Sequence, residues 1–401
     1  MASTPVPAAP ASVTPLHAAG RFKPLKISVT RSVDGLLAME SDWRALEAQA
    51  DTACLFQSFD WCANYVRHAG DTQPLAVRVL SAWQGERMVA LLPLSVQTNN
   101  GARVLTGLTE PFQQYTDMLV APGVDAKIVF AEMLRSLRGS DVDYLHFGQV
   151  REDANLFRAL DGVVPPSGEE DAAPYVRIGD FPDFDTFHKS VVNAKTRKNM
   201  RNARNRLERD APVVHEVARA GPLLGEVIDR SFEGREAWLE RQGLTSRAFR
   251  DQNFGAFLDR FKHPERTGVE TVAFSLSHGG RTIADQWGFI HRGRYYAFIA
   301  SWDPAYEEAS PGKMHLGEIL AACHGLGVEV ADFMIPAARY KFTWASEAVK
   351  VRDFVMPISW KGRLHNALWL NFLRPLAKKI AYSIPVSLRA WIFRKVMPIR
   401  D

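Results

Sequence analysis

The segment RYYAFIASW, residues 294–302, and the segment ASPGKMHLGEIL, residues 309–320, decide the fold. The first is a run of aromatic and aliphatic residues that predicts a β-strand. The second begins with a Ser-Pro-Gly turn, and apolar residues then recur at helical spacing, which predicts a helix over residues 312–327. A helix start carries free N–H groups and a partial positive charge, so a phosphate could bind there. Ser-Pro is also ordinary capping chemistry at a helix start.

The same order of elements occurs twice in the chain, which predicts a repeated αβ unit. In the first half we expect strands at residues 87–96 and 114–122, a helix at 126–139 and a strand at 142–150. In the second half we expect strands at residues 281–293 and 294–302, the helix at 312–327 and a strand at 328–335. Strands mixed with intervening helices predict an α/β or α+β fold, with a sheet that carries helices on its faces.

Composition shifts divide the chain into four parts. Residues 1–22, rich in Pro and Ala and without Lys or Arg up to position 20, predict a disordered tail and no signal peptide. The segment DGVVPPSGEEDAAP, residues 161–174, is rich in Pro, Gly and acid and predicts a linker. The expected domains therefore span residues 23–165 and 175–360, and residues 361–401 form a separate basic tail.

Bulk composition is that of a folded cytoplasmic protein. The chain has 401 residues, 46% hydrophobic and 23% charged. Its three cysteines, Cys54, Cys62 and Cys323, form no CxxC pair, so we expect neither a disulfide framework nor a metal site. His315 and His324 lie on different faces of the predicted helix and predict no shared metal. No DNA partner is expected, and the body argues against a large RNA.

The charge is concentrated at one end of the chain. Residues 361–401 carry nine Lys or Arg and only Asp401 as an acid, whereas the preceding residues have a net charge of −4. Trp and aliphatic residues are interleaved with these cations. This pattern predicts either an in-plane helix on anionic lipid at the cytoplasmic face of the inner membrane, or a helical hairpin packed on the body. No run of eighteen apolar residues predicts a spanning helix.

Six segments in register resemble the CelD/BcsL-like branch of the GNAT acyltransferases, which is related to the FemAB peptidoglycan transferases. They are FQSFDW (56–61), LLPL (91–94), YTDMLV (115–120), KTRKNMRNARNRLERD (195–210), SPGKMHL (310–316) and DFMIPAARYKFTW (332–344). The resemblance covers about residues 50–358. It implies two tandem GNAT-like domains, each a mixed central sheet flanked by helices. It also implies that the second domain carries the acyl-transfer site, in an enzyme of exopolysaccharide, cellulose, holdfast or biofilm production.

The resemblance implies an acyl-CoA donor, most simply acetyl-CoA. The GNAT pyrophosphate loop is reduced here to Pro311 and Gly312, and FemAB-like relatives use aminoacyl-tRNA instead. We expect the helix start to hold the donor phosphates, through Ser310, Pro311, Gly312, Lys313 and Met314.

Acyl transfer to an amine needs a base and a donor for the oxyanion. Lys341 aligns with the Lys of the Phe-Lys motif of FemAB-like transferases, and Tyr340 beside it is a second hydrogen-bond donor. Asp285 interrupts an apolar strand, and Asp303 follows a strand end, so both are candidate bases, although Asp303 fits a turn cap equally well. Glu318 and Asp332 are further candidates.

If residues 186–209 form one helix, Arg197, Arg201 and Arg204 share a face. Guanidinium forks suit phosphates, and three anions fit: a nucleotide- or lipid-linked amino sugar, an RNA backbone, or cyclic di-GMP, because RKNMR has an Arg-x-x-x-Arg spacing. Alternatively, these arginine residues form a basic helix face that is exposed to solvent and binds no ligand.

The main hypothesis is an N-acyltransferase that moves an acetyl group onto an amino sugar of an exopolysaccharide precursor, regulated by cyclic di-GMP. One alternative is a FemAB-like aminoacyl-tRNA-dependent transferase. The other is a catalytically degenerate, GNAT-shaped effector that senses a nucleotide.

Overall fold

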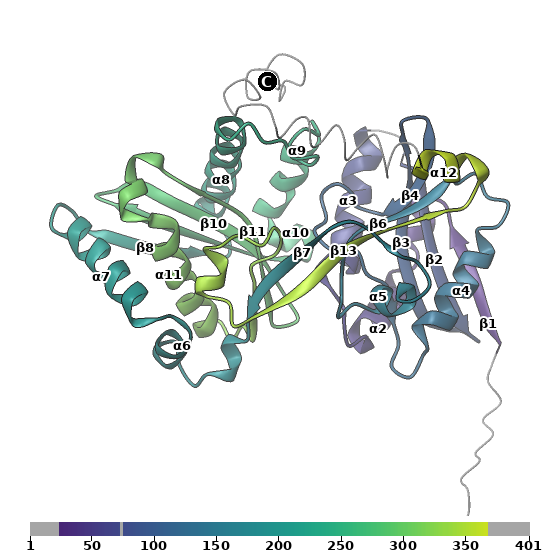
Figure 1. Ribbon diagram of the computed structural model, residues 1–401, viewed down its shortest axis with the longest axis horizontal. Helices are drawn as coiled ribbons and strands as arrows, with labels where there is room; N and C mark the ends of the chain where they lie inside the picture. Colours follow the sequence, from purple (N-terminus) through teal and green to yellow (C-terminus); the bar gives the residue numbers. More distant parts are fainter. Residues whose placement is uncertain (1–23, 73–74, 368–401) are drawn as a thin grey trace, which may run out of the picture.

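The computed structural model describes residues 24–72 and 75–367. Its centre is one mixed sheet that runs through both halves of the molecule, with helices on its faces (Figure 1). The strands are β1 (Leu25–Thr30), β2 (Val77–Gln84), β3 (Arg87–Asn99), β4 (Ala102–Gly107), β5 (Leu119–Val120), β6 (Tyr144–Arg151), β7 (Pro166–Val176), β8 (Val213–Ala218), β9 (Glu270–His278), β10 (Arg281–His291), β11 (Arg294–Trp302), β12 (Val330–Asp332) and β13 (Glu347–Pro357).

The helices alternate with these strands. They are α1 (Val33–Leu37), α2 (Glu40–Gln49), α3 (Phe59–Thr72), α4 (Ala126–Ser136), α5 (Asn155–Leu160), α6 (Phe184–Val191), α7 (Ala194–Glu208), α8 (Pro222–Arg241), α9 (Phe254–Asp259), α10 (Pro264–Thr267), α11 (Pro311–Gly325) and α12 (Trp360–His365). The expected mixed α/β architecture is confirmed.

The strand order is β1-β2-β3-β4-β6-β13-β7-β12-β11-β10-β9-β8, with β5 paired to β3. Each half contains antiparallel strands followed by one parallel pair, β4 with β6 and β11 with β12. The expectation of a separate sheet in each domain is corrected, because β13 and β7 join the two halves edge to edge. Figure 1 shows these two strands crossing the middle of the molecule.

The predicted linker is a strand. Residues 166–176 form β7, which pairs with β12 on one side and β13 on the other. Its acidic residues have partners in β13: Glu170 forms ion pairs with Lys350 (3.3 Å) and Arg352 (2.5 Å). Such cross-strand pairs stabilise a sheet, but they bring together segments far apart in the sequence. The Pro, Gly and acid content of the segment therefore reflects an exposed strand, not a flexible connection.

Two other local predictions are corrected. The strand expected at residues 114–122 is only Leu119–Val120. The single helix expected at 186–209 is two helices, because the chain becomes extended at Val192 and Asn193. The side chain of Asn193 accepts a hydrogen bond from Thr196 N (2.9 Å) and so caps α7.

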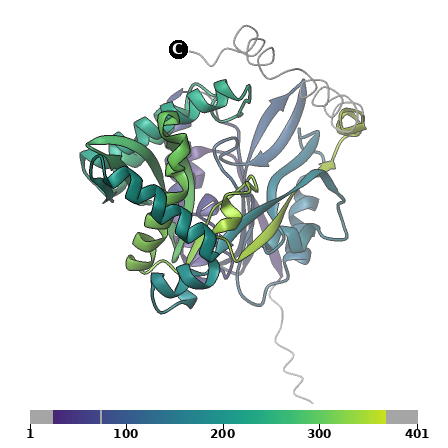
Figure 2. The same cartoon turned by 60° about the vertical axis from the view of Figure 1, so that its left-hand side comes forward.

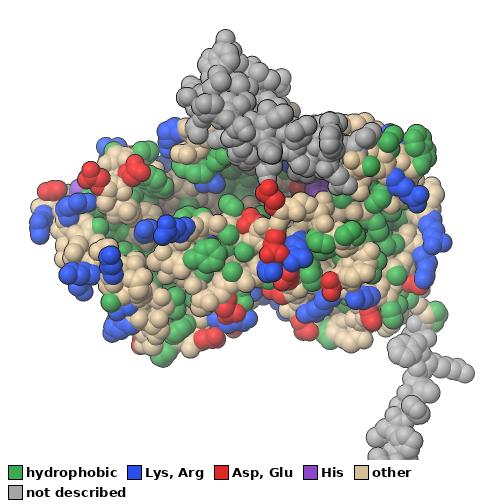
Figure 3. Space-filling model, viewed as in Figure 1, with side chains coloured by type: hydrophobic (Ala, Val, Ile, Leu, Met, Phe, Trp, Pro, Cys, Tyr) green, Lys and Arg blue, Asp and Glu red, His purple; other side chains and the backbone are tan. Residues whose placement is uncertain are grey.

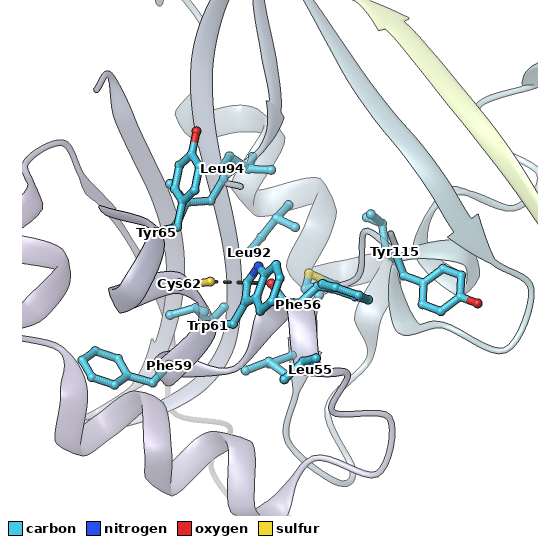
Figure 4. Packing of buried hydrophobic residues seen from close by; sticks show 14 of the residues in the cluster. Leu55, Phe56, Phe59, Trp61, Cys62, Tyr65, Leu92, Leu94 and Tyr115 are labelled. Carbon is cyan, nitrogen blue, oxygen red and sulfur yellow. Dashed lines mark hydrogen bonds between the residues drawn. The ribbon is translucent and has the colours of Figure 1, made fainter. Parts of the chain in front are cut away.

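The hydrophobic core is continuous across the halves. Trp61 of α3 packs edge to face against Phe257 of α9 and Phe289 of β10, at ring centroid distances of 5.3 and 5.4 Å. Figure 4 shows Trp61 beside Phe56 and, further along, Tyr115 of the first half. The motif FQSFDW is thus part of the core.

The described chain ends just after α12, so the predicted tail from residue 368 onward and the predicted tail 1–22 lie outside the described residues. Within residues 24–72 and 75–367, no helix has the length and apolar character needed to cross a bilayer.

Asp332, at the end of β12, is the centre of the junction. Its side chain is fully buried and binds Arg151 Nη1 of the first half (2.6 Å) and Arg294 Nη1 of the second (3.2 Å). The hydroxyl of Tyr115 donates to it at 3.0 Å, and the N–H of Met334 at 2.9 Å. A buried carboxylate with four donors is satisfied, so Asp332 is a structural residue and not the free base considered from the sequence.

Replacing Asp332 by Asn should therefore destabilise the whole protein. Removing one partner of a buried ion pair leaves charges uncompensated and costs about 3–5 kcal/mol. Urea denaturation followed by circular dichroism measures this loss, with Asp185→Asn on the exposed face of α6 as the control that should change little. Equal stability of the two variants would contradict the structural role of Asp332.

Candidate active site

A pocket of about 900 Å³ lies where β11 and β12 separate. The two parallel strands pair only from Arg294 with Val330 to Tyr296 with Asp332. Beyond that point β11 continues through residues 297–302, and no other strand of the described chain pairs with it on this side. These residues line the pocket, together with residues 333–336. The sheet therefore opens into a cavity with a free strand edge.

Helices α8 and α11 approach opposite faces of β11 at the pocket. A Cβ built on Gly234 of α8 would lie 2.7 Å from the Cβ of Ser301, and one built on Gly312 of α11 would lie 3.9 Å from Cδ1 of Trp302. Successive residues of a strand point to opposite faces. The pocket thus has an α11 side and an α8 side.

The α11 side is a helix start with few free donors. Pro311 has no N–H, and the N–H groups of Lys313 and Met314 bond to Ser310 O (3.0 and 3.4 Å). Ser310 has a left-handed backbone and makes no side-chain cap. An anion here would meet the N–H of Gly312, the helix dipole and the Lys313 ammonium.

Four of the five predicted phosphate-binding residues line the pocket: Ser310, Pro311, Gly312 and Lys313. Met314 does not, because it is buried in a cluster with Ala284 and Leu276.

Lys341 is buried at the pocket wall. Its Nζ donates to the carbonyls of Met334 (2.8 Å) and Pro336 (2.9 Å), and in the described chain no acceptor is bonded to its third N–H. Burial lowers the pKa of Lys341 to about 8, although the nearby Asp332 carboxylate opposes this shift. Lys341 thus holds the pocket loop in place and retains one free donor.

Tyr340 lines the same pocket and is 46% exposed there. Burial of its ring by surrounding atoms raises the pKa of the phenol, and the charge of Arg235 partly offsets the effect. The phenol consequently keeps its proton at neutral pH and can donate it.

The two predicted bases are committed elsewhere. Asp285 lines the pocket, but its oxygens bind Arg230 Nε (2.8 Å) and Nη2 (3.3 Å), and its side chain is 2% exposed. Asp303 lies outside the pocket lining, where it caps the turn through Ala305 N (2.9 Å) and pairs with Arg281 (2.5 Å). Each oxygen of both carboxylates thus accepts a hydrogen bond from the protein.

The arginine residues of α7 also lie outside the pocket lining. Arg197 donates to the carbonyls of Lys189 and Val192, and Arg204 pairs with Glu208 and Glu318. Arg201 is exposed. Lys and Arg side chains are spread over the end of the molecule where α7 lies (Figure 3). Glu318, another base candidate, is engaged as the partner of Arg204.

Other pocket residues were not singled out from the sequence as site residues. Arg235 and Trp238 project from α8, and Gln114 and Gln149 come from the first half. His315 also lines the pocket; burial lowers its pKa well below the ordinary value, so it is a neutral imidazole. Among these polar residues Gln149 has an unusual backbone conformation, with a positive φ of 58°. A backbone angle cannot be read from a sequence. Among the described residues no group of three His, Cys, Asp or Glu is placed to hold a metal.

Comparison with known proteins agrees with this geometry. Residues 194–342, from α7 through the pocket loop, match the family described as acetyltransferase (GNAT) domain. The matched segment lies wholly in the second half of the chain. None of the curated protein sequences matches the chain.

Several solved structures match most of the chain. A crystal structure of FemX is 10% identical with a TM-score of 0.56, and the match covers 82% of this chain and 98% of that one, which shows a shared fold. A tandem GNAT protein from the clavulanic acid biosynthesis pathway is 12% identical, with a TM-score of 0.46 over 84% and 99% of the two chains. L-PGS from Bacillus licheniformis is 13% identical, with a TM-score of 0.44 over 71% and 87%.

The buried Lys341 ammonium predicts an unusual pH dependence of stability. Its pKa is about 8 in the folded protein and near 10.5 when unfolded, so between these values the unfolded state binds more protons. Wild-type stability should therefore rise relative to Lys341→Met by about 3 kcal/mol as the pH increases from 8 to 10.5. Urea unfolding across this pH range measures the difference. Lys195→Met, on an exposed residue of α7, should run parallel to wild type. If the stability of Lys341→Met changed with pH in parallel with that of wild type, the pKa of Lys341 would not be lowered in the folded protein.

Proposed function

We propose that the protein is an N-acyltransferase that uses an acyl-CoA donor, most simply acetyl-CoA. The observation that carries this proposal is the separation of β11 and β12 beside the start of α11, within the segment that matches the GNAT family. GNAT domains generally use acyl-CoA. The free edge of β11 at residues 297–302 offers alternating N–H and C=O groups, and an extended amide-containing chain such as pantetheine can bind there as an added strand.

The donor phosphates would lie at the start of α11. The Gly312 N–H, the helix dipole and Lys313 supply the positive potential there. This is a sparse anion site, because Pro311 contributes no donor. The Lys313 ammonium compensates as a full charge at the pocket wall.

Two residues fit the chemistry at the thioester. An amine nitrogen attacks the thioester carbonyl, the C–N bond forms, the C–S bond breaks, and the amine proton passes to water. The third N–H of Lys341 can donate to the oxyanion, since its other two are fixed by backbone carbonyls. The protonated phenol of Tyr340 can donate its proton to the departing thiolate and recover one from water.

The acceptor we propose is an amino sugar of an exopolysaccharide precursor. The pocket supports a polar, ring-sized acceptor because aromatic residues, including Phe112, Phe249 and Phe254, line it together with Gln114 and Gln149. Regulation by cyclic di-GMP gains no support from the contacts of α7, since Arg197 and Arg204 already have partners. An aminoacyl-tRNA donor is the competing proposal.

The first test is calorimetric titration with acetyl-CoA. Gly312→Glu places a carboxylate at the helix start, where only Trp302 Cδ1 lies within 4 Å of the new Cβ, so the fold should be kept. We expect its affinity to fall by about tenfold or more, because like charges repel at close range. Gly325→Glu, at the exposed end of the same helix, is the matched control with no atom within 4 Å. Absence of acetyl-CoA binding to wild type would remove the proposed function.

Tyr340→Phe isolates the proton donor. We expect kcat for acetyl transfer to fall about 10²-fold while the affinity for acetyl-CoA stays the same, because only the hydroxyl is lost. A coupled thiol-release assay measures the rate. Unchanged kcat would assign the proton transfer to another group or to water.

A further inference from the structure

A half-buried guanidinium in the pocket has no anionic partner. Arg235 of α8 lines the cavity and is half-buried, and no hydrogen bond or ion pair connects it to the described part of the chain. Its neighbour one turn earlier differs: Arg230 binds Asp285 and Glu226. A partly buried cation without a counter-charge is costly unless something else supplies that charge.

Arg235 is held in place by an aromatic ring. Its guanidinium carbon lies 4.2 Å from the ring centroid of Trp238, one turn along α8, and Trp238 lines the pocket too. Such a cation–π contact uses the face of the ring and leaves the N–H groups of Arg235 available for oxygen ligands.

The surroundings of Arg235 are cationic. Burial lowers the pKa of Arg235, and the phenol oxygen of Tyr340 partly opposes this shift. Lys341 lies close enough for the charge of Arg235 to contribute to its lowered pKa, after burial itself. The one carboxylate on the neighbouring strand, Asp285, is already bound by Arg230. Arg235 and Lys341 both face the cavity. Glu307, the other acid of its lining, is exposed and forms no ion pair with either of them, so an anionic ligand can supply the counter-charge.

The first half contributes uncommitted amides to the same cavity. The Oε1 atoms of Gln114 and Gln149 are buried and have no hydrogen-bond partner within the described residues. Gln149 also has a left-handed backbone, with φ of 58°, which for a residue other than Gly is uncommon and often accompanies function. Buried amides without partners can accept hydrogen bonds from hydroxyl or amino groups of a ligand.

Arg235 lies on the opposite side of β11 from the expected donor phosphates. It follows Gly234, which contacts Ser301, whereas Gly312 lies beside Trp302, the next residue of β11. An oxyanion at Arg235 would therefore belong to the second substrate and not to the CoA phosphates.

We propose that Arg235 binds a carboxylate or phosphate of the acyl acceptor, while Gln114 and Gln149 bind its hydroxyl or amino groups. The acceptor is thus an anionic, hydroxyl-bearing amine, and this assignment rests on the proposed acyltransferase function.

The test compares matched sugars with and without an anion. Glucosamine 6-phosphate is titrated against glucosamine, and glucuronate against glucose, by calorimetry. For one of these pairs, wild type should prefer the anionic member by about tenfold, the value of a charge-assisted hydrogen bond. Arg235→Gln should reduce the preference to about threefold or less, and Arg235→Lys should keep part of it, because a point charge remains without the fork. The pair that responds identifies phosphate or carboxylate.

Arg241→Gln is the control, because Arg241 is an exposed pocket residue of the same helix and should leave the preference intact. Thermal unfolding of each variant checks that it is folded. The proposal is overturned if wild type prefers neither anionic sugar, or if Arg235→Gln keeps the preference. Acetyl-CoA titration of the same proteins separates the two ideas: loss of donor binding in wild type removes the acyltransferase, whereas an intact donor site with no anion preference removes only the role of Arg235.

Discussion

The buried carboxylate of Asp332 is the constraint on which the arrangement of the two halves depends. A charge with no exposed surface must be paired, and its partners come from three places in the chain: Arg151 and Tyr115 in the first half, and Arg294 in β11. Because these groups cannot be satisfied in an isolated half, the network couples the halves more tightly than a linker could. The same point in the sheet is where β12 ends and the pocket begins. The buried charge of Asp332 and the start of the pocket therefore both lie at the end of β12. Figure 2 shows the two halves from another side, with the strands that join them between.

The network also extends into the site through the backbone. Asp332 accepts the N–H of Met334, a residue with φ of 59°, and the carbonyl of Met334 accepts Lys341 Nζ. A left-handed backbone at a non-Gly residue costs about 1 kcal/mol or more, and it persists only where its surroundings fix it. Here the carboxylate on one side and the ammonium on the other do so. Asp332, which does not line the pocket, thus helps to set the position of Lys341, which does. A change at the junction between the halves is therefore expected to alter the pocket.

The sequence predicted the elements whose signals are local. The strands β10 and β11 and the helix α11 follow from apolar periodicity and turn residues. Prediction from the sequence failed where the role of a side chain depends on a partner that is distant in the sequence. The acids of residues 161–174 indicated a linker because Glu170 finds Lys350 and Arg352 only after folding. Asp285 looked like a free acid in an apolar strand, yet Arg230 approaches it from a helix 55 residues away in sequence. Arg235 gave no signal, since what distinguishes it is the lack of a partner, which a sequence cannot display.

The αβ unit occurs in both halves, so the first half could be expected to contain a similar pocket. Its parallel pair, β4 and β6, also separates after three residue pairs, at Thr106 and His146. There, however, the side chain of Gln113 packs directly against Gly107, where a Cβ would lie 2.1 Å from Gln113 Nε2. Hydrogen bonds with Thr109 and Thr116 hold Gln113 in this position. A plugged opening cannot admit a donor chain. The plug continues to Tyr115, which binds Asp332, and to Gln114, which faces the open pocket of the second half. The segment that packs against the end of β4 therefore also contributes to the wall of the pocket in the second half.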